Sequence, residues 1–300
     1  MLKERPDTRS DLQTHSPIPA TSGKALGRRT PRPFLKWVGG KTQLLPQLTL
    51  EVARAGPIQR YHEPFLGGGA LYFELSRRGQ AHGAALSDSN VNLIEAYVGV
   101  RDELLAVEER LRWHAARHDS EHYYRIRAER SSHLAERAAR LIYLNKTCFN
   151  GLYRENSRGD FNVPIGDYTN PTILDEENLT ACSRHLSHAD LSVARFEEVV
   201  NRARAGDFVY FDPPYVPVSR TSSFTGYGPS GFSALDQHRL AAVFQDLSAM
   251  GVKAMLSNSY ADMVLELYGG YRIVTVHATR AINSNAERRG KVREVIVCNF

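Results

Sequence analysis

The sequence is poor in cysteine and contains no long apolar run. Its 300 residues include only three cysteines, Cys148, Cys182 and Cys298, which lie far apart and follow no metal-ligand spacing. This pattern indicates neither a disulfide framework nor a zinc site, and it suits a reducing cytoplasm. No window approaches the roughly eighteen consecutive apolar residues of a membrane helix, and the amino terminus lacks the apolar core of a signal peptide. We therefore expect a protein that is neither exported nor membrane-spanning.

Positive charge is concentrated near the amino terminus. The chain has a net charge of +5, and residues 1–33 carry seven cations and three anions, a net of +4 that leaves +1 for the remainder. The segment is rich in Pro, Ser and Thr and poor in large apolar residues, which predicts a disordered basic tail. A DNA-binding arm and a solubilising leader or over-long start both remain open. Overall basicity is therefore weak evidence for nucleic-acid binding.

Short apolar strands alternate with helices at both ends of the remaining chain. The first part predicts a helix over 41–53, a strand over 61–65, a helix through Leu75, a strand over 84–88 and a helix from Asn90. The last part predicts a strand over 189–196, a helix to Arg204, a strand over 208–211, a helix over 232–250, a strand over 253–256 and a terminal antiparallel pair, 271–276 with 294–298. This alternation predicts an α/β fold with a mainly parallel sheet covered on both faces.

The middle of the chain has a different pattern. Residues 101–146 predict long amphipathic helices dense in Arg and Glu, and residues 147–168 are rich in Gly, Asn and aromatics, which predicts a long hairpin or loop. We therefore expect a domain in two parts, 34–95 and 172–300, interrupted by an inserted domain over 96–171.

The run Asp212-Pro213-Pro214-Tyr215 carries the clearest chemical signal. It follows the buried strand directly, at the carboxyl end where open α/β sheets bind ligands. Prolines supply no N–H, so the Pro213 carbonyl can face outward as a free acceptor. Asp212 and that carbonyl could accept both N–H groups of an adenine N6 amine, and Tyr215 offers a face on which an extruded base could stack. The alternative for the tetrapeptide alone is a proline-rich strand end with a solvated carboxylate.

Glycines follow the strand that ends near Phe65. Gly67, Gly68 and Gly69 allow close approach of a ligand to the backbone, and Asp88 follows Gly67 by 21 residues, near the offset of about 20 at which an acid reaches ribose hydroxyls. Tyr72 replaces the last glycine of the dinucleotide fingerprint, which favours a nucleoside without phosphate, such as S-adenosylmethionine. A glycine turn needed only for packing is the alternative.

A second glycine run resembles a phosphate-binding loop only superficially. Gly39-Gly40-Lys41-Thr42 has the ending of that loop, but Leu35 stands where its first glycine is required. We therefore expect no NTPase. Lys41 is better explained as a cation near a carboxylate; Trp37 could pack on a cofactor, and the alternative for a lone Trp is a core residue.

Five blocks taken together resemble the DNA adenine methylase (Dam-like) family. They are Phe34 to Lys41, Glu63 to Gly69, Asp88, Asp212 to Tyr215 and Arg288 to Glu294, in the family's order from about Arg32 to the chain end. The resemblance implies a Rossmann-like methyltransferase with an inserted target-recognition domain. It implies that Trp37, Lys41, Phe65, Gly67, Asp88, Phe196 and Asp212 bind S-adenosylmethionine, and that Asp212, Pro213, Pro214 and Tyr215 are catalytic.

The segments 144–154 and 158–168 are similar to the target-recognition hairpin of GATC-methylating members. The resemblance implies DNA contacts by Lys36, Phe149, Asn150, Leu152, Arg154, Pro164 and Tyr168, with Phe149 inserting into the base stack and Lys36 reading the first guanine. A folding hairpin with a core Phe is the alternative. Asp167 and Arg195 depart from the family pattern, which puts a phosphate contact and contacts to the cofactor's adenine in doubt.

The expected activity is transfer of a methyl group from S-adenosylmethionine to adenine N6 in double-stranded DNA, at GATC, by base flipping and without a covalent enzyme intermediate. We expect a cytoplasmic, nucleoid-associated monomer of bacterial or phage origin that uses no metal. A catalytically silent DNA-binding protein on the same scaffold and a methyltransferase for structured RNA remain as alternatives.

Overall fold

The computed structural model describes residues 30–217, 232–279 and 291–300, and within them seven strands form one sheet. In spatial order the strands are β3 (Asp190–Val193), β2 (Ala85–Asp88), β1 (Tyr61–Glu63), β4 (Phe208–Phe211), β5 (Lys253–Ser259), β7 (Lys291–Cys298) and β6 (Arg272–Thr279). The first five are parallel, and β7 lies antiparallel between β5 and β6. The predicted mainly parallel sheet with a terminal antiparallel pair is confirmed.

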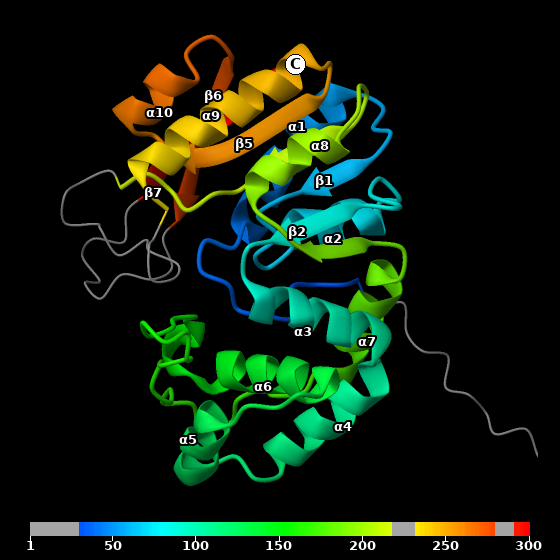
Figure 1. Ribbon diagram of the computed structural model, residues 1–300, viewed down its shortest axis with the longest axis vertical. Helices are drawn as coiled ribbons and strands as arrows, with labels where there is room; N and C mark the ends of the chain where they lie inside the picture. The colour runs from blue at the N-terminus through cyan, green and yellow to red at the C-terminus, as the bar shows by residue number, and fades with distance from the viewer. Residues whose placement is uncertain (1–29, 218–231, 280–290) are drawn as a thin grey trace, which may run out of the picture.

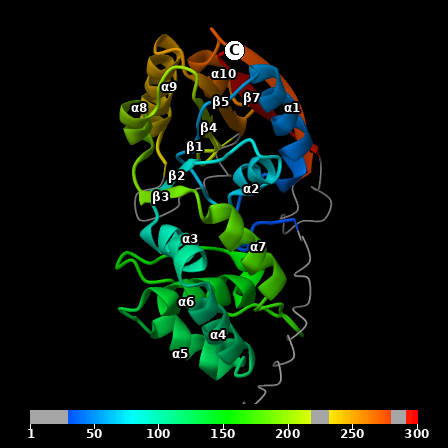
Figure 2. The same ribbon diagram turned by 90° about the vertical axis from the view of Figure 1, so that its right-hand side faces the viewer.

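Helices cover both faces of this sheet (Figure 2). Side chains of a strand alternate between faces, so the wholly apolar β4 divides between two cores. Phe208 and Tyr210 belong to the core under α1 (Leu45–Ala55), α2 (Ala70–Arg77) and α3 (Val91–Asp102), whereas Val209 and Phe211 belong to the core under α8 (Val199–Arg202), α9 (Ala234–Ala249) and α10 (Asp262–Leu267). Burial on both faces explains why this strand has only aliphatic and aromatic residues.

The middle of the chain forms a helical lobe beside the sheet (Figure 1). It contains α4 (Leu104–Ala115), α5 (Ser120–Ala128) and α6 (Leu134–Thr147), and α6 packs against both α3 and α4. The segment after α6 begins with a 3-10 turn, η2 (Phe149–Gly151), and is closed by isolated bridges between Cys148 and Ile165 and between Glu155 and Phe161. The predicted hairpin or loop is thus a long loop that two single bridges close.

Several predicted boundaries need correction. The strand predicted over 189–196 ends at Val193, because its neighbour β2 ends opposite that residue, and Phe196 begins a 3-10 turn, η3 (Phe196–Glu198). A 3-10 turn, η1 (Thr42–Leu44), precedes α1, and α7 (Glu176–Leu186) and α10 were not predicted. Strand β5 extends three residues beyond its predicted end, to Ser259.

The chain ends qualify two further predictions. Residues 1–29 of the predicted tail, and Arg288 to Gly290 of the terminal block, lie outside the described residues. The described chain begins at Thr30, and Arg32 contacts α7: its backbone N–H donates to Asn178 Oδ1 at 2.9 Å, and its guanidinium pairs with Asp175 at 3.0 Å. Within the described ranges, we find no helix that is both long and apolar enough to cross a membrane.

Candidate active site

Asp212 is the first residue after β4 and lies at the carboxyl edge of the sheet. The Lys41 ammonium approaches its Oδ1 at 2.8 Å, and the Ser257 hydroxyl on neighbouring β5 donates to the same oxygen at 2.9 Å. The side chains of Lys41 and Asp212 are 8% and 19% exposed. The predicted pairing of Lys41 with a carboxylate is therefore present, and Asp212 still reaches solvent.

Three carboxylates line this edge, one at the end of each of three adjacent strands. Asp88 ends β2, Glu63 ends β1, and Asp212 follows β4. Burial raises the pKa of all three, and that of Glu63 rises to about 8, with Asp212 and Asp88 adding repulsion. For Asp212 the nearby Lys41 opposes the rise in pKa. An edge with this surplus of buried carboxylates favours a cationic ligand.

Tyr215 lies beside the pair formed by Lys41 and Asp212. The Lys41 ammonium is 4.6 Å from the centroid of the Tyr215 ring, and the Tyr215 hydroxyl donates to Glu294 on β7 at 3.0 Å. No hydrogen bond from another described residue to the Pro213 carbonyl is found. The Asp212 carboxylate and the Tyr215 ring therefore both lie beside Lys41 at one point of the sheet edge.

The glycine turn and Asp88 form a second part of the site. The Gly67 N–H donates to Asp88 Oδ2 at 3.1 Å, and the Asn90 N–H donates to Oδ1 at 3.0 Å. Gly67 has a φ of 47°, and a Cβ atom built there would lie 2.9 Å from Trp37 Cδ1. Glycine is thus required both for the backbone conformation and for the close approach of the Trp37 ring.

Aromatic rings line the space next to this turn. Phe65 and Phe196 stack with centroids 5.3 Å apart, and Phe232 meets them at 5.7 Å and 5.8 Å. Phe232 lies just before α9, where the sequence offered no signal beyond an apolar helix start. Arg195 points into an ion pair with Glu197 at 2.9 Å, and its side chain is 61% exposed.

The residues predicted to contact DNA gather around the loop after α6. Lys36 Nζ lies 4.4 Å from the centroid of the Tyr168 ring, and Arg154 Nε donates to Asn162 at 2.7 Å. The Phe149 backbone N–H donates to Pro164 O at 2.9 Å, which holds the turn in place. The Phe149 side chain is nevertheless 50% exposed. A large apolar side chain exposed to this extent differs from the core Phe of the alternative interpretation.

The other residues of this group differ in exposure. Asn150 has a φ of 54°, a conformation that few residues other than glycine adopt. Leu152 packs against the core, whereas Pro164 and Asp167 are exposed.

Asn145 was missed because it lies on α6 among apolar residues. It is fully buried, and its amide exchanges two hydrogen bonds of 2.7 Å with the backbone of Lys36 and donates to Gly151 O at 3.1 Å. A polar residue within a buried helix face was the available signal. Asn145 joins the segment that carries Lys36 to the turn that carries Phe149.

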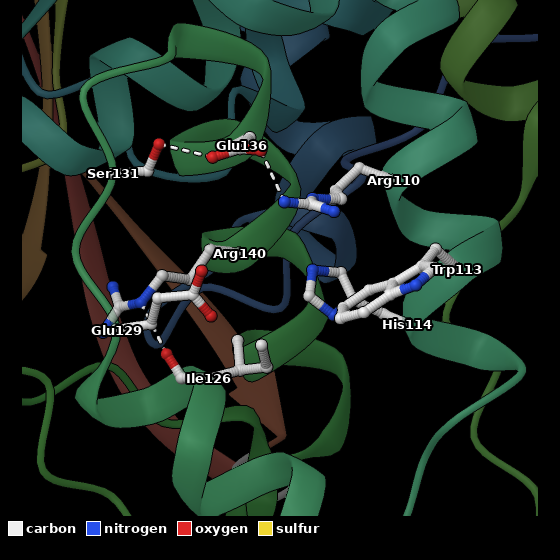
Figure 3. Close-up of a pocket in the computed structure, with 8 residues that line it drawn as sticks. All are labelled: Arg110, Trp113, His114, Ile126, Glu129, Ser131, Glu136 and Arg140. Atoms are coloured by element: carbon white, nitrogen blue, oxygen red, sulfur yellow. Dashed lines mark hydrogen bonds and ion pairs between the residues drawn. The ribbon is translucent and has the colours of Figure 1, made fainter.

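The loop after α6 and the glycine turn are connected through aromatic rings. Tyr153 of the loop lies 5.1 Å from Trp37, which itself packs on Gly67. A separate cavity in the helical lobe, between α4 and the start of α6 (Figure 3), measures about 10 Å³. That volume admits about one water molecule, so this cavity is no substrate site.

Comparison with known proteins identifies the family. The model of the D12 class N6 adenine-specific DNA methyltransferases matches residues 37–282. The chain is 42% identical to the type II methyltransferase M1.LlaDCHI of Lactococcus lactis subsp. cremoris, over 90% of this chain and 95% of the relative. It is 40% identical to the type II methyltransferase M.MjaIII of Methanocaldococcus jannaschii, over 90% and 99%, and 33% identical to the DNA adenine methylase of Serratia marcescens, over 88% and 97%. These matches confirm the predicted family resemblance and enzyme class: the chain belongs to the D12 class of N6 adenine-specific DNA methyltransferases.

Proposed function

We propose that this chain methylates adenine N6 at GATC in duplex DNA, with S-adenosylmethionine as donor, after flipping the target base into the pocket at Asp212. The observation that carries the proposal is the juxtaposition of the Asp212 carboxylate and the Tyr215 ring beside an acidic sheet edge, with Pro213 between them in the chain to supply the second acceptor. Two acceptors and a stacking face match an adenine that presents an amine with two N–H groups.

The acidic edge fits S-adenosylmethionine. This donor carries a sulfonium and an ammonium group, both cationic. The carboxylates of Asp88 and Asp212 supply the complementary charge, whereas Glu63, whose pKa rises to about 8, is mostly protonated at neutral pH. Phe65 and Phe196 offer apolar surface to its adenine, and the glycine turn lets the Trp37 ring lie close to the backbone beside Asp88, where the ring can pack on the nucleoside. When bound, the donor supplies an electrophilic methyl group.

The protein's own groups prepare the amine. Asp212 and the Pro213 carbonyl accept its two N–H bonds, which turns the nitrogen lone pair out of conjugation with the ring. Lys41 and Ser257 hold the Asp212 carboxylate in place, each with a single contact. After the amine has gained the methyl group, it loses a proton. Burial raises the pKa of Asp212 above its ordinary value, so this carboxylate takes that proton more readily than an exposed aspartate does. The transfer is direct and forms no bond to the enzyme.

The helical lobe serves target recognition in this proposal, as residues 96–171. The 50% exposure of Phe149 supports its insertion into the space that a flipped base leaves, and Lys36, beside the Tyr168 ring, would read a guanine edge. A cavity of about 620 Å³ beside the loop has five arginines and two acidic residues in its lining, which favours an anionic backbone.

The test has two arms. Purified protein is given tritiated S-adenosylmethionine with duplex DNA, or with structured RNA of the same sequence, and the D212A variant serves as the inactive control. We expect transfer to DNA only, at a rate that D212A lowers at least ~100-fold; transfer to RNA, or near wild-type activity of D212A, contradicts the proposal. Sequencing of N6-methyladenine in cellular DNA tests the site, since methylation mostly outside GATC rejects that specificity.

A further inference from the structure

The segment that carries the catalytic residues, 212–217, is held by buried amides from two other elements. The Gln237 Nε2 group on α9 donates to Pro214 O at 3.0 Å, and the Val216 N–H donates to Asn258 Oδ1 on β5 at 3.1 Å. Asn258 Nδ2 in turn donates to Gln237 Oε1 at 3.2 Å. Gln237 is 3% exposed and Asn258 is fully buried.

These three hydrogen bonds form a circuit that the backbone from Pro214 to Val216 closes, and in each of them the donor and the acceptor are fixed. It starts at the Val216 N–H, which requires the oxygen of Asn258, and it ends at the Pro214 carbonyl, which requires the nitrogen of Gln237. The orientation of both amides is therefore fixed by the backbone that they hold. A carboxylate in place of Gln237 would still accept from Asn258, but it would turn an oxygen toward an oxygen at Pro214.

The circuit acts on ψ of Pro214, a backbone torsion that the two prolines leave unrestricted. Both prolines have φ fixed by their rings, and Asp212 and Pro213 each precede a proline, which restricts their ψ to extended values. The ψ angle of Pro214 has no such restriction, and its carbonyl is the atom that Gln237 binds. This angle determines where the Tyr215 ring lies relative to the Asp212 carboxylate and the Pro213 carbonyl.

We propose that Gln237 is a positioning residue for catalysis: through Pro214 it sets the stacking face of Tyr215 against the two acceptors of the target amine. This inference rests on the proposed function and concerns the same pocket. The bond from the Tyr215 hydroxyl to Glu294 holds the far end of the ring, whereas Gln237 holds its backbone end. A displaced stacking face leaves the bound adenine misaligned with the methyl donor, which slows the chemical step rather than binding.

The experiment compares Q237E with Q245E. Gln245 lies on the same helix and is exposed, so its substitution makes the same chemical change away from the catalytic loop. Under single-turnover conditions we expect Q237E to lower the methylation rate by roughly 100-fold, the scale expected for misplaced reacting groups, with binding of S-adenosylmethionine and DNA unchanged. We expect Q245E to match the wild type.

A pH series separates positioning from a general loss of structure. When the introduced carboxylate is protonated, its O–H can donate to Pro214 O again, so the ratio of the Q237E rate to the wild-type rate should rise as the pH falls. A folding defect predicts no such recovery, and a ratio that stays constant with pH overturns the proposal. An active wild type with an equally active Q237E overturns this inference alone, whereas a wild type inactive on DNA overturns the proposed function with it.

Discussion

Replacing Ser257 with alanine tests how the Asp212 carboxylate is kept ready for the substrate. Ser257 is fully buried on β5, donates to Asp212 Oδ1 at 2.9 Å and lies 2.8 Å from the Tyr210 hydroxyl. Because its one proton goes to Asp212, Ser257 accepts from Tyr210. The substitution removes one of the two groups that stabilise the charged carboxylate and leaves Lys41 as the other.

The size of the effect follows from these contacts. A hydrogen bond to a charged group contributes about 1.5–3 kcal/mol. One pKa unit corresponds to about 1.4 kcal/mol, so loss of this hydrogen bond raises the pKa of Asp212 by roughly one to two units. This rise adds to the one that burial already causes. The ionised Asp212 is the stronger acceptor and can take the proton that the amine loses, so activity is present above this pKa and is lost as the pH falls through it. In S257A the acidic limb of the rate profile should therefore move to higher pH by the same amount.

The assay is the single-turnover methylation rate at saturating S-adenosylmethionine and DNA, measured from about pH 5 to pH 9. S248A is the control, since its hydroxyl donates to Phe244 O within α9 and does not touch the catalytic loop. Thermal unfolding checks the fold, because Tyr210 loses its partner at a cost of about 1–3 kcal/mol. An acidic limb that stays in place while the variant folds and binds its substrates would refute this account of Asp212.

Three further changes test other parts of the structure. D212A removes the carboxylate acceptor, and we expect the methylation rate to fall at least ~100-fold, about 3 kcal/mol of transition-state stabilisation, in the same single-turnover assay. G67A places a Cβ atom 2.9 Å from Trp37 at a φ of 47°, so affinity for S-adenosylmethionine, measured by calorimetry, should fall while the exposed G79A control, with open space around its Cβ, retains it. Burial lowers the pKa of His114 to about 3, so the folded protein binds fewer protons than the unfolded chain between that pH and about 6.5. Stability should be fully present above pH ~6.5 and decline as the pH falls below it, and H114F should flatten this dependence in urea unfolding curves.

The sheet and the position of the tetrapeptide Asp212 to Tyr215 at its edge were predictable because their signals are local. Strand β4 is a continuous apolar run, and the tetrapeptide follows it directly, so the position of Asp212 at the sheet edge needed no knowledge of distant residues. The offset between Gly67 and Asp88 is likewise a property of one βα unit, and the structure joins them through a hydrogen bond of 3.1 Å.

The residues that hold the segment 212–217 were not predictable from such local signals. Ser257 and Asn258 are polar, so the strand was predicted to end at Leu256, yet β5 continues to Ser259 and all three polar side chains are buried. The polarity marks partners in the catalytic loop, more than 40 residues earlier in the chain, rather than the end of the strand. A prediction based on hydrophobicity alone treats a polar residue as exposed. It cannot detect that such a residue is buried when its hydrogen-bond partner is distant in the sequence.

The short segment from Lys36 to Lys41 shows how one stretch of chain joins the functions. At its start, the backbone of Lys36 is bonded twice to Asn145 of the helical lobe. Its next residue, Trp37, packs on the glycine turn, and at its end Lys41 pairs with Asp212. A displacement of α6 would act on this segment through Asn145, and Lys41, which pairs with Asp212, follows Lys36 by only five residues. Six consecutive residues therefore make the contacts that join the helical lobe to the glycine turn and to Asp212, although the helical lobe itself is inserted far away in the sequence.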